Sequence, residues 1–251
     1  MLRPMPVDSD KSLDKRSRGV SRNGKRGIKR LWTASHFWFE GRLERVVVAL
    51  AYRRLHYSSA CVQTRWLGSQ ALKNPLDLWI YQEIITETRP EVIVETGTAH
   101  GGSAAYLASI CELLGSGEVI SIDITPISPD YPKHSRITYL GGRSSTTEEL
   151  IKEVRKRTEG KRTMVILDSD HSESHVTAEL EIYAPLVSPG CFLIVEDTAI
   201  GLVMRDQLPG PAQALKKFLS GSRDFEVDAT RERYLLTNLP GGYLRRREAT
   251  A

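Results

Sequence analysis

The sequence predicts an α/β domain built around a largely parallel sheet. Short runs rich in valine and isoleucine alternate with helical patterns, as they do in βαβ units. The last two runs are only a few residues apart, so they can pair as an antiparallel hairpin. The predicted strands are 91–96, 118–124, 136–140, 163–168, 191–196, 225–228 and 234–238. The predicted helices of the domain are about 76–88, 101–114, 146–158, 173–186 and 211–220.

Two segments precede this domain, which we place at 76–251. Residues 1–30 hold ten Lys and Arg residues against three Asp, a balance of +7, which leaves 4 − 7 = −3 for the rest of the chain. A basic and polar segment of this kind is typical of a disordered, solvated tail. Residues 31–75 show helical spacing of apolar residues over about 34–57, which predicts an N-terminal helical segment.

The composition is that of an ordinary globular protein, with 40% hydrophobic and 26% charged residues. The basic tail lacks the apolar stretch of a secretory signal, and no run approaches the ~20 apolar residues of a transmembrane helix. Cys61, Cys111 and Cys191 have no metal-type spacing, so we expect reduced thiols in a cytoplasmic protein. We expect a homo-oligomer and no nucleic-acid partner, and peripheral membrane contact through the tail stays open.

A glycine-rich turn follows the first predicted strand, in the run VIVETGTAHGGSAA at 92–105. Gly97 permits a tight turn, and Gly101 and Gly102 allow a ligand to approach the backbone where a helix begins. Glu95 would repel a pyrophosphate, so the turn suits a cationic or zwitterionic ligand such as S-adenosylmethionine.

Further polar residues extend this predicted pocket. Asp123 ends the second strand, where a carboxylate of a doubly wound fold accepts hydrogen bonds from ribose hydroxyl groups. The run GGRSS at 141–145 follows the third strand and continues the wall. The alternative interpretation is that these are ordinary polar residues at strand ends.

Two apolar runs, TMVILDSDHS at 163–172 and CFLIVEDT at 191–198, end abruptly in carboxylates. Ligands of open α/β sheets bind beyond the carboxyl ends of the strands, so the two ends should meet beside the pocket. Clustered carboxylate oxygens suit Mg²⁺ or another hard divalent cation. The alternative is that Asp168 and Asp170 cap the helix that begins at 173.

His171 follows the first of these strands, and its reference pKa of about 6.5 suits proton abstraction near neutral pH. We expect it to be the general base, and Asp170 is the alternative.

Together these motifs resemble the cephalosporin hydroxylase/rhamnosyl O-methyltransferase family of class I S-adenosylmethionine-dependent methyltransferases. The resemblance spans roughly 62–247 and includes TRWLGSQALKNPLDLWIYQEII, VIVETGTAHGGSA, VILDSDHS, LIVEDT, LPGP and NLPGGYLRR. It implies a Rossmann-like, seven-stranded, mostly parallel sheet with an antiparallel last strand. It also implies a methyl-donor site, which we place at Glu95, Gly97, Gly101, Gly102, Ser103, Asp123, Arg143 and Ser144.

The resemblance further implies that Asp168, Glu196 and Asp197 are ligands of Mg²⁺ and that His171 is the base. The expected reaction is methylation of a hydroxyl group, on a deoxysugar of a glycolipid or natural product. The acceptor is expected to face 31–75 and 198–212. Two alternatives stay open: a component of cephalosporin-type hydroxylation or methoxylation, and a non-catalytic protein that only binds the donor.

Overall fold

The computed structural model describes residues 46–248, except 59, 203 and 205–207. The predicted tail at 1–30 and the start of the predicted helical segment, 31–45, lie outside the described residues. The part of that segment that is described forms a helix over 46–57, a 3-10 helix at Cys61–Gln63, and a two-stranded antiparallel ladder of β1 (Arg65–Trp66) and β2 (Ser69–Gln70).

A seven-stranded sheet forms the centre of the domain, with the strands in the spatial order β5-β4-β3-β6-β7-β9-β8. The strands from β5 to β7 are parallel, whereas β9 runs antiparallel to β7 and to β8. This arrangement confirms the predicted sheet with its reversed last strand. The strands are β3 (Val92–Thr96), β4 (Glu118–Ile122), β5 (Ile137–Leu140), β6 (Thr163–Leu167), β7 (Phe192–Val195), β8 (Phe225–Val227) and β9 (Tyr243–Arg246).

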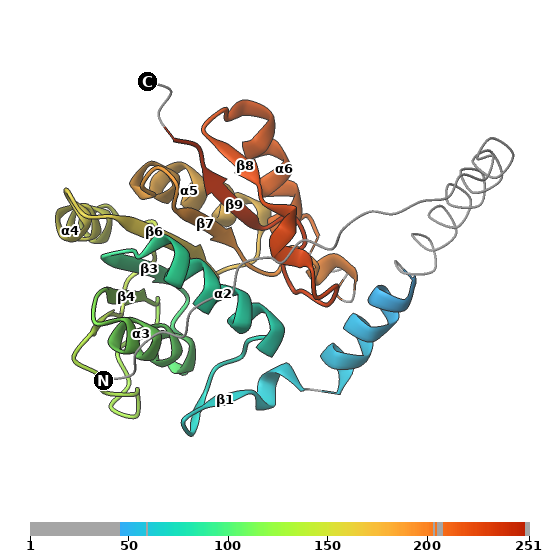
Figure 1. The fold of residues 1–251 in the computed structure, drawn as a ribbon, viewed down its shortest axis with the longest axis horizontal. Coiled ribbons are helices and arrows are strands. Elements are labelled where there is room, and N and C mark those ends of the chain that lie inside the picture. The colour runs from blue at the N-terminus through green and yellow to red at the C-terminus, as the bar shows by residue number, and fades with distance from the viewer. Residues whose placement is uncertain (1–45, 59, 203, 205–207, 249–251) are drawn as a thin grey trace, which may run out of the picture. The chain divides into compact units, whose positions relative to one another are not determined.

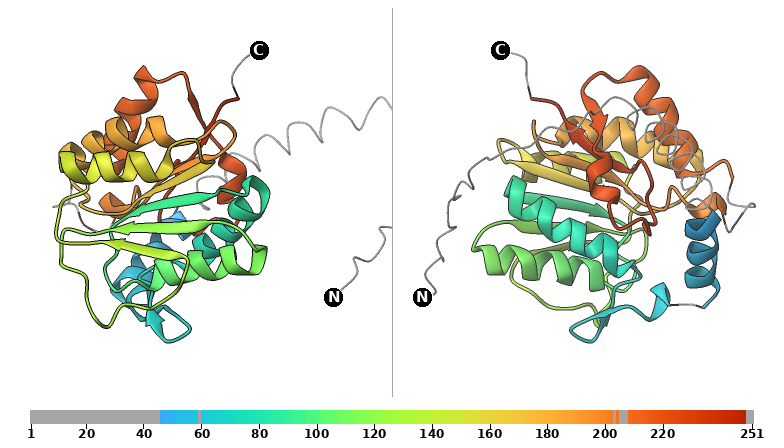
Figure 2. Two further views of the ribbon diagram at one scale, coloured as in Figure 1. Left: turned by 90° about the vertical axis from the view of Figure 1, so that its left-hand side faces the viewer. Right: turned by 45° about the vertical axis from the view of Figure 1, so that its right-hand side comes forward.

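Helices cover both faces of this sheet and give three layers (Figures 1 and 2). The helices Pro75–Thr88 and Gly102–Leu114 pack on one face of the sheet, and the three helices that follow them in the chain pack on the other face. No helix among the described residues has both the length and the apolar character needed to cross a membrane. The helices are α2 (Pro75–Thr88), α3 (Gly102–Leu114), α4 (Glu148–Thr158), α5 (Glu173–Tyr183) and α6 (Pro211–Gly221), with 3-10 helices at Ala184–Leu186, Ile200–Leu202 and Ala229–Glu232.

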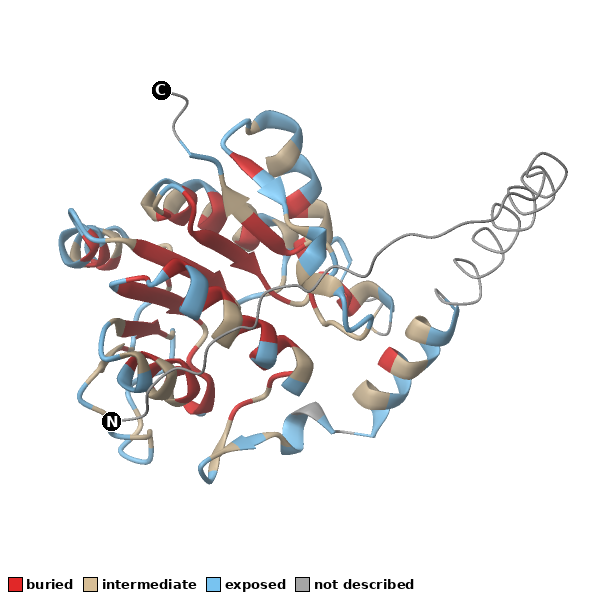
Figure 3. Ribbon diagram, in the orientation of Figure 1, coloured by how far each residue is buried: buried red, intermediate tan, exposed pale blue. Residues whose placement is uncertain are grey.

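The core lies on the two faces of the central strands, which are buried along their whole length (Figure 3). Side chains of a strand alternate between faces, so Val92 and Val94 pack towards α4, α5 and α6, while Ile93 packs towards α2 and α3. The thiols of Cys111 and Cys191 are buried and free, as expected for reduced cysteines.

The prediction of a strand at 234–238 is wrong. This segment lies against the start of α2, because the Asp77 carboxylate accepts hydrogen bonds from Thr237 Oγ1 (2.6 Å) and Asn238 N (2.9 Å). The Asn74 side chain also donates to the carbonyl of Leu236 (2.9 Å). The last strand is instead β9, which begins five residues after this segment and pairs antiparallel with β8.

Candidate active site

The carboxylates after β6 and β7 lie side by side because these strands are parallel neighbours. Leu167 pairs with Val195 at the end of the ladder, so the next residues are Asp168 on one strand and Glu196 on the other. The register is held by two backbone hydrogen bonds, from Glu196 N to the Leu167 carbonyl (3.0 Å) and from Asp168 N to the Thr96 carbonyl (3.0 Å). The strand order therefore brings Asp168, Glu196 and Asp197 together.

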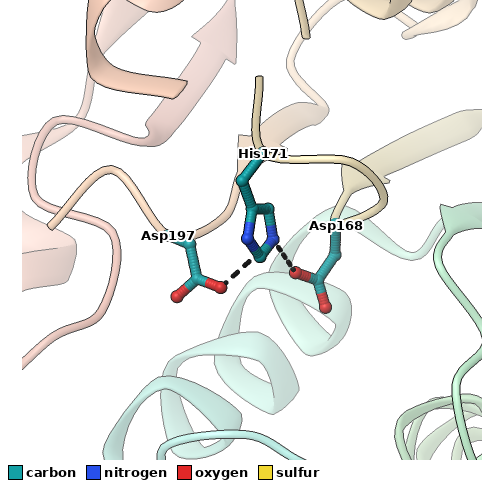
Figure 4. Close-up of side chains that lie close together, drawn as sticks. All are labelled: Asp168, His171 and Asp197. Atoms are coloured by element: carbon teal, nitrogen blue, oxygen red, sulfur yellow. Dashed lines mark ion pairs between the residues drawn. The ribbon is translucent and has the colours of Figure 1, made fainter. Parts of the chain in front are cut away.

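His171 joins this group from the loop between β6 and α5 (Figure 4). Its Nε2 atom lies 3.2 Å from Asp197 Oδ2 and 3.5 Å from Asp168 Oδ1. The same atom is buried and makes no well-formed hydrogen bond to the described residues. One ligand atom from each of Asp168, His171 and Asp197 lies within 4.8 Å of the other two, which is compatible with a shared cation.

The loop that carries His171 is shaped by the residues that follow it. Ser172 is the N-cap of α5, and its hydroxyl accepts from His175 N (3.4 Å). Asp170 accepts a hydrogen bond from Ser172 N (2.7 Å) in the turn before the helix. Neither Asp168 nor Asp170 is therefore the helix cap, and Asp168 is left to face the cluster.

A lysine that the sequence analysis did not single out lies in the cluster. Lys73 Nζ is 2.6 Å from Asp168 Oδ2 and 2.6 Å from Glu196 Oε1, and the Lys73 side chain is 5% exposed. The hydroxyl of Tyr81, on α2, also donates to Glu196 Oε1. Glu196 therefore contacts two residues that are distant from it in the sequence, Lys73 and Tyr81. The Glu196 side chain is 3% exposed.

The cluster holds more negative charge than burial favours. Burial, together with the nearby Asp168, raises the pKa of Asp197 to about 6. Burial also acts to raise the pKa of Glu196, whereas the contact with Lys73 opposes this effect and favours the charged carboxylate. Burial acts on Asp168 as well, but Lys73 and His171 outweigh it and lower the pKa of that carboxyl. An additional cation would therefore be bound favourably here.

A cavity of about 410 Å³ opens beside the cluster at the carboxyl ends of β3, β4 and β6. Among the described residues that line it, three are aspartates and none is lysine or arginine. A wall of this charge favours a cationic ligand. The lining residues are Gly97, Ala99, Ile122, Asp123, Ile124, Ser144, Ser145, Asp168, Ser169, Asp170 and His175.

Asp123 fixes the shape of this cavity. Its Oδ2 atom accepts from Thr98 N (2.9 Å) and Ala99 N (3.0 Å), in the turn after β3. Its Oδ1 atom accepts from the backbone and hydroxyl of Thr125. Although burial opposes the effect, these hydrogen bonds lower the pKa of Asp123, so the carboxylate stays charged at the cavity wall.

The other predicted donor-binding residues differ in position. Gly97 and Ser144 line the cavity. Glu95 is fully buried beneath it, where Ser121 donates to its Oε2 atom (2.9 Å), and burial raises its pKa to about 7. Arg143 lies 3.4 Å from Glu153 Oε2 and is outside the lining.

Close packing requires glycine at positions 101 and 102, because a larger residue would clash with its neighbours. A Cβ atom on Gly102 would lie 2.2 Å from the Gln70 carbonyl oxygen, and one on Gly101 would lie 2.8 Å from Pro132 Cδ. Gly102 and Ser103 are buried in the first turn of α3. Gly101, Gly102 and Ser103 are not among the described residues that line the cavity.

His175, one helical turn beyond His171, belongs to the cavity rather than to the cluster. Its Nε2 atom lies 3.1 Å from Ser145 Oγ and 3.5 Å from Glu179 Oε1. The hydrogen bond with Glu179 raises the pKa of His175. The only signal in the sequence was its spacing of four residues from His171.

A second, smaller cavity of about 210 Å³ lies on the Asp197 side of the cluster. It is lined by residues of the helix over 46–57, of the segment before α2, and of the segments after β7 and before β9. These are Tyr52, Leu55, His56, Val62, Leu72, Asp197, Ile200 and Asn238. Asp168 lines the first cavity and Asp197 the second, so the cluster lies between them.

Comparison with known proteins identifies the family. The family model described as rhamnosyl O-methyltransferase/CmcI matches residues 58–247. The rhamnosyl O-methyltransferase of Mycobacterium tuberculosis is 34% identical over 206 residues, which cover 78% of this chain and 84% of that protein. The chain belongs to the rhamnosyl O-methyltransferase/CmcI family. The Mycobacterium leprae enzyme of the same name is 32% identical over 211 residues, covering 80% and 91% of the two chains.

Solved structures of this family have the same fold. An apo structure of CmcI matches with a TM-score of 0.59 and 24% identity, and covers 75% of this chain and 78% of CmcI. A CmcI structure with Mg and SAM matches with a TM-score of 0.58 and 22% identity, over 74% and 78% of the two chains. The class I methyltransferase fold inferred from the sequence is confirmed.

The ionisation of His171 leads to a prediction for the metal-free protein. Burial alone would lower its pKa, but Asp168 and Asp197 outweigh burial and raise it from 6.5 to about 9. The protonated ring therefore stabilises the fold fully below pH ~6.5, and this contribution is lost as the pH rises towards 9. In EDTA, the wild type should exceed His171→Ala in free energy of unfolding near pH 6.5, and the difference should shrink by pH 9.

Urea denaturation of both proteins at several pH values measures this difference. Titrations of groups outside the cluster are common to the two proteins and cancel in the comparison. A difference that is constant or grows with pH would contradict the assignment of His171 as a cation in the metal-free cluster.

Proposed function

We propose that this chain transfers a methyl group from S-adenosylmethionine to a hydroxyl group of a rhamnose-like deoxysugar on a glycolipid or natural product, with a divalent cation. Membership of the rhamnosyl O-methyltransferase/CmcI family supports the reaction class, an S-adenosylmethionine-dependent O-methyltransferase. The observation that carries the proposal is the position of the carboxylate cluster between two cavities, since a transferase needs donor and acceptor on either side of its reacting centre.

The larger cavity is our proposed donor site. Its size is within the usual range for a small-molecule site, and its three aspartates suit the positive sulfonium and ammonium groups of the donor. Asp123 is at the end of β4, the position at which a carboxylate binds ribose hydroxyl groups in doubly wound folds. Ser144 and Ser145 add hydroxyl groups along the same wall.

The smaller cavity is our proposed acceptor site. A deoxysugar has an apolar face with its methyl group and an edge of hydroxyl groups. Leu55 and Leu72 provide an apolar wall for the first, and Asn238 and Asp197 provide polar groups for the second. Most of the lining residues come from the two segments in which the sequence analysis expected the acceptor, 31–75 and 198–212.

Asp168 and Asp197, with Glu196 beside them, are our proposed ligands for the divalent cation, and the excess negative charge of the cluster fits such an ion. When bound, a divalent cation lowers the pKa of a neighbouring hydroxyl group and helps to orient it. His171 Nε2 faces both aspartates and is our proposed proton acceptor in the metal-bound enzyme, where the cation would offset the carboxylate charge that keeps the ring protonated without metal. The two cavity walls hold donor and acceptor in line, which supplies part of the rate.

The geometry does not favour an iron-dependent hydroxylation component. The facial iron site of such enzymes uses two histidines and one carboxylate. Here the cluster contains one histidine with several carboxylates, because His175 is held by Ser145 and Glu179.

The function is tested by incubation of the purified protein with labelled S-adenosylmethionine and a panel of rhamnosylated lipids and glycosylated natural products. We expect label in the product with Mg²⁺, loss of turnover in EDTA, and recovery when Mg²⁺ is added back. Full turnover in EDTA would contradict the metal proposal. Transfer only to acceptors without a sugar would contradict the acceptor class.

Replacement of Asp123 tests the donor site. Asp123→Asn should weaken S-adenosylmethionine binding by about 1.5–3 kcal/mol, the usual contribution of a hydrogen bond to a charged group. Calorimetry measures the affinity, and circular dichroism checks that the variant is folded. Asp130→Asn, an exposed aspartate in the loop after β4, is the matched control and should leave the affinity unchanged. Equal affinities for the two variants would place the donor elsewhere.

The acceptor site is tested by filling the smaller cavity. Leu55→Trp should raise the KM for the sugar acceptor by at least ~10-fold, while the dissociation constant of the donor stays the same, because the added ring volume occupies only one cavity. Leu50→Trp lies on the same helix at a position that is 62% exposed and outside the lining, so it is the control. An unchanged KM in Leu55→Trp would argue against this cavity.

A further inference from the structure

We propose that Lys73 is a built-in cation of the carboxylate cluster, which keeps the cluster folded without a divalent ion and which such an ion must displace in order to bind. The Lys73 ammonium group contacts Asp168 and Glu196 at the same time, at 2.6 Å each. These two carboxylates belong to different strands, so one side chain bridges the tips of β6 and β7.

The position of Lys73 is fixed by the start of α2. Asn74 is the N-cap of this helix, and its side chain accepts from Leu76 N (3.0 Å) while it donates to the Leu236 carbonyl (2.9 Å). Pro75 follows as the first helical residue. The backbone that follows Lys73 is therefore anchored, and the start of a helix holds the ammonium group in the cluster.

The charges around Lys73 explain why a cation is needed at this point. Three carboxylates, Asp168, Glu196 and Asp197, are packed together, and Glu95 lies close enough to act on Lys73 as well. The Lys73 ammonium group lies 2.6 Å from both Asp168 and Glu196, so it is the counter-charge between these two carboxylates, where a metal ion could otherwise bind.

Competition with a divalent ion follows from the atoms involved. The two oxygens that bind Lys73 belong to residues that we propose as metal ligands, so this part of the inference depends on the proposed function. Lys73 binds Asp168 at Oδ2, whereas His171 faces the Oδ1 atom of Asp168 and also lies near Asp197. Asp168 Oδ1 and Asp197 would therefore be open to a cation, whereas Glu196 Oε1 would be open only after the ammonium group moves.

The test compares thermal unfolding in EDTA of the wild type, Lys73→Met, Glu196→Gln and the double variant. Methionine keeps the length of the side chain and removes the charge. Removal of one partner of a buried ion pair leaves the other uncompensated, so Lys73→Met should lower Tm by roughly 6–20 °C. The double variant should recover a large part of this loss, because Glu196→Gln removes the charge that Lys73→Met leaves unpaired.

Lys161→Met is the matched control. Lys161 Nζ is also 2.6 Å from a carboxylate, Glu118 Oε1, but its side chain is 41% exposed, so Tm should change by no more than about 4 °C. A Tm of Lys73→Met equal to that of the control would overturn the proposal. If Lys73→Met does not fold in EDTA, a folded double variant supports the proposal, and an unfolded double variant overturns it.

A titration with MgCl₂, followed by Tm, tests the displacement. Mg²⁺ should raise the Tm of Lys73→Met more than that of the wild type, with a half-maximal concentration at least ~10-fold lower. Equal responses would overturn the displacement. Absence of a response in both proteins would overturn the displacement and the metal proposal together, whereas the charge balance is decided separately by the comparison in EDTA.

Discussion

Burial of several carboxylates at the touching ends of two parallel strands is the constraint on which this structure depends. Carboxylates in contact repel one another, and burial adds to the cost of their charge. The surrounding elements meet this cost: α2 begins with Lys73 and places Tyr81 against Glu196, and the loop after β6 turns His171 back towards Asp197. A fold that served stability alone would have little reason to keep such a cluster.

The sequence determined the fold to a large extent because the central strands are short, apolar and buried on both faces. The apolar composition of such strands is visible in the local sequence. The predicted bounds of the first five strands therefore agree with β3 to β7 within one or two residues. The strand prediction failed near the end of the chain. The run YLLTN at 234–238 has the composition of a strand, but hydrogen bonds to Asp77 and Asn74 hold it against α2. These partners are some 160 residues away, so no local pattern could reveal them.

The same limit applies to the site. Asp168, Glu196 and Asp197 could be grouped from sequence because parallel strands end at a common edge of the sheet. Lys73 could not, because it is a single basic residue before a helix, and its contact with Asp168 spans 95 residues of chain. His175 follows His171 by only four residues, yet it lies on α5, contacts Ser145 and lines the larger cavity. Their short spacing could not show that one histidine belongs to the loop and the other to the helix.

Gly97 connects the two halves of the site most directly. Its φ of +90° turns the chain after β3, and a Cβ atom there would lie 1.9 Å from the backbone oxygen of Asp168. The turn beneath the larger cavity and the first residue of the cluster are thus in main-chain contact, and neither can shift without the other. The helix over 46–57, in contrast, lines only the smaller cavity and contributes no residue to the cluster. The shape of the smaller cavity can therefore change through that helix while the contact between Gly97 and Asp168 stays as it is.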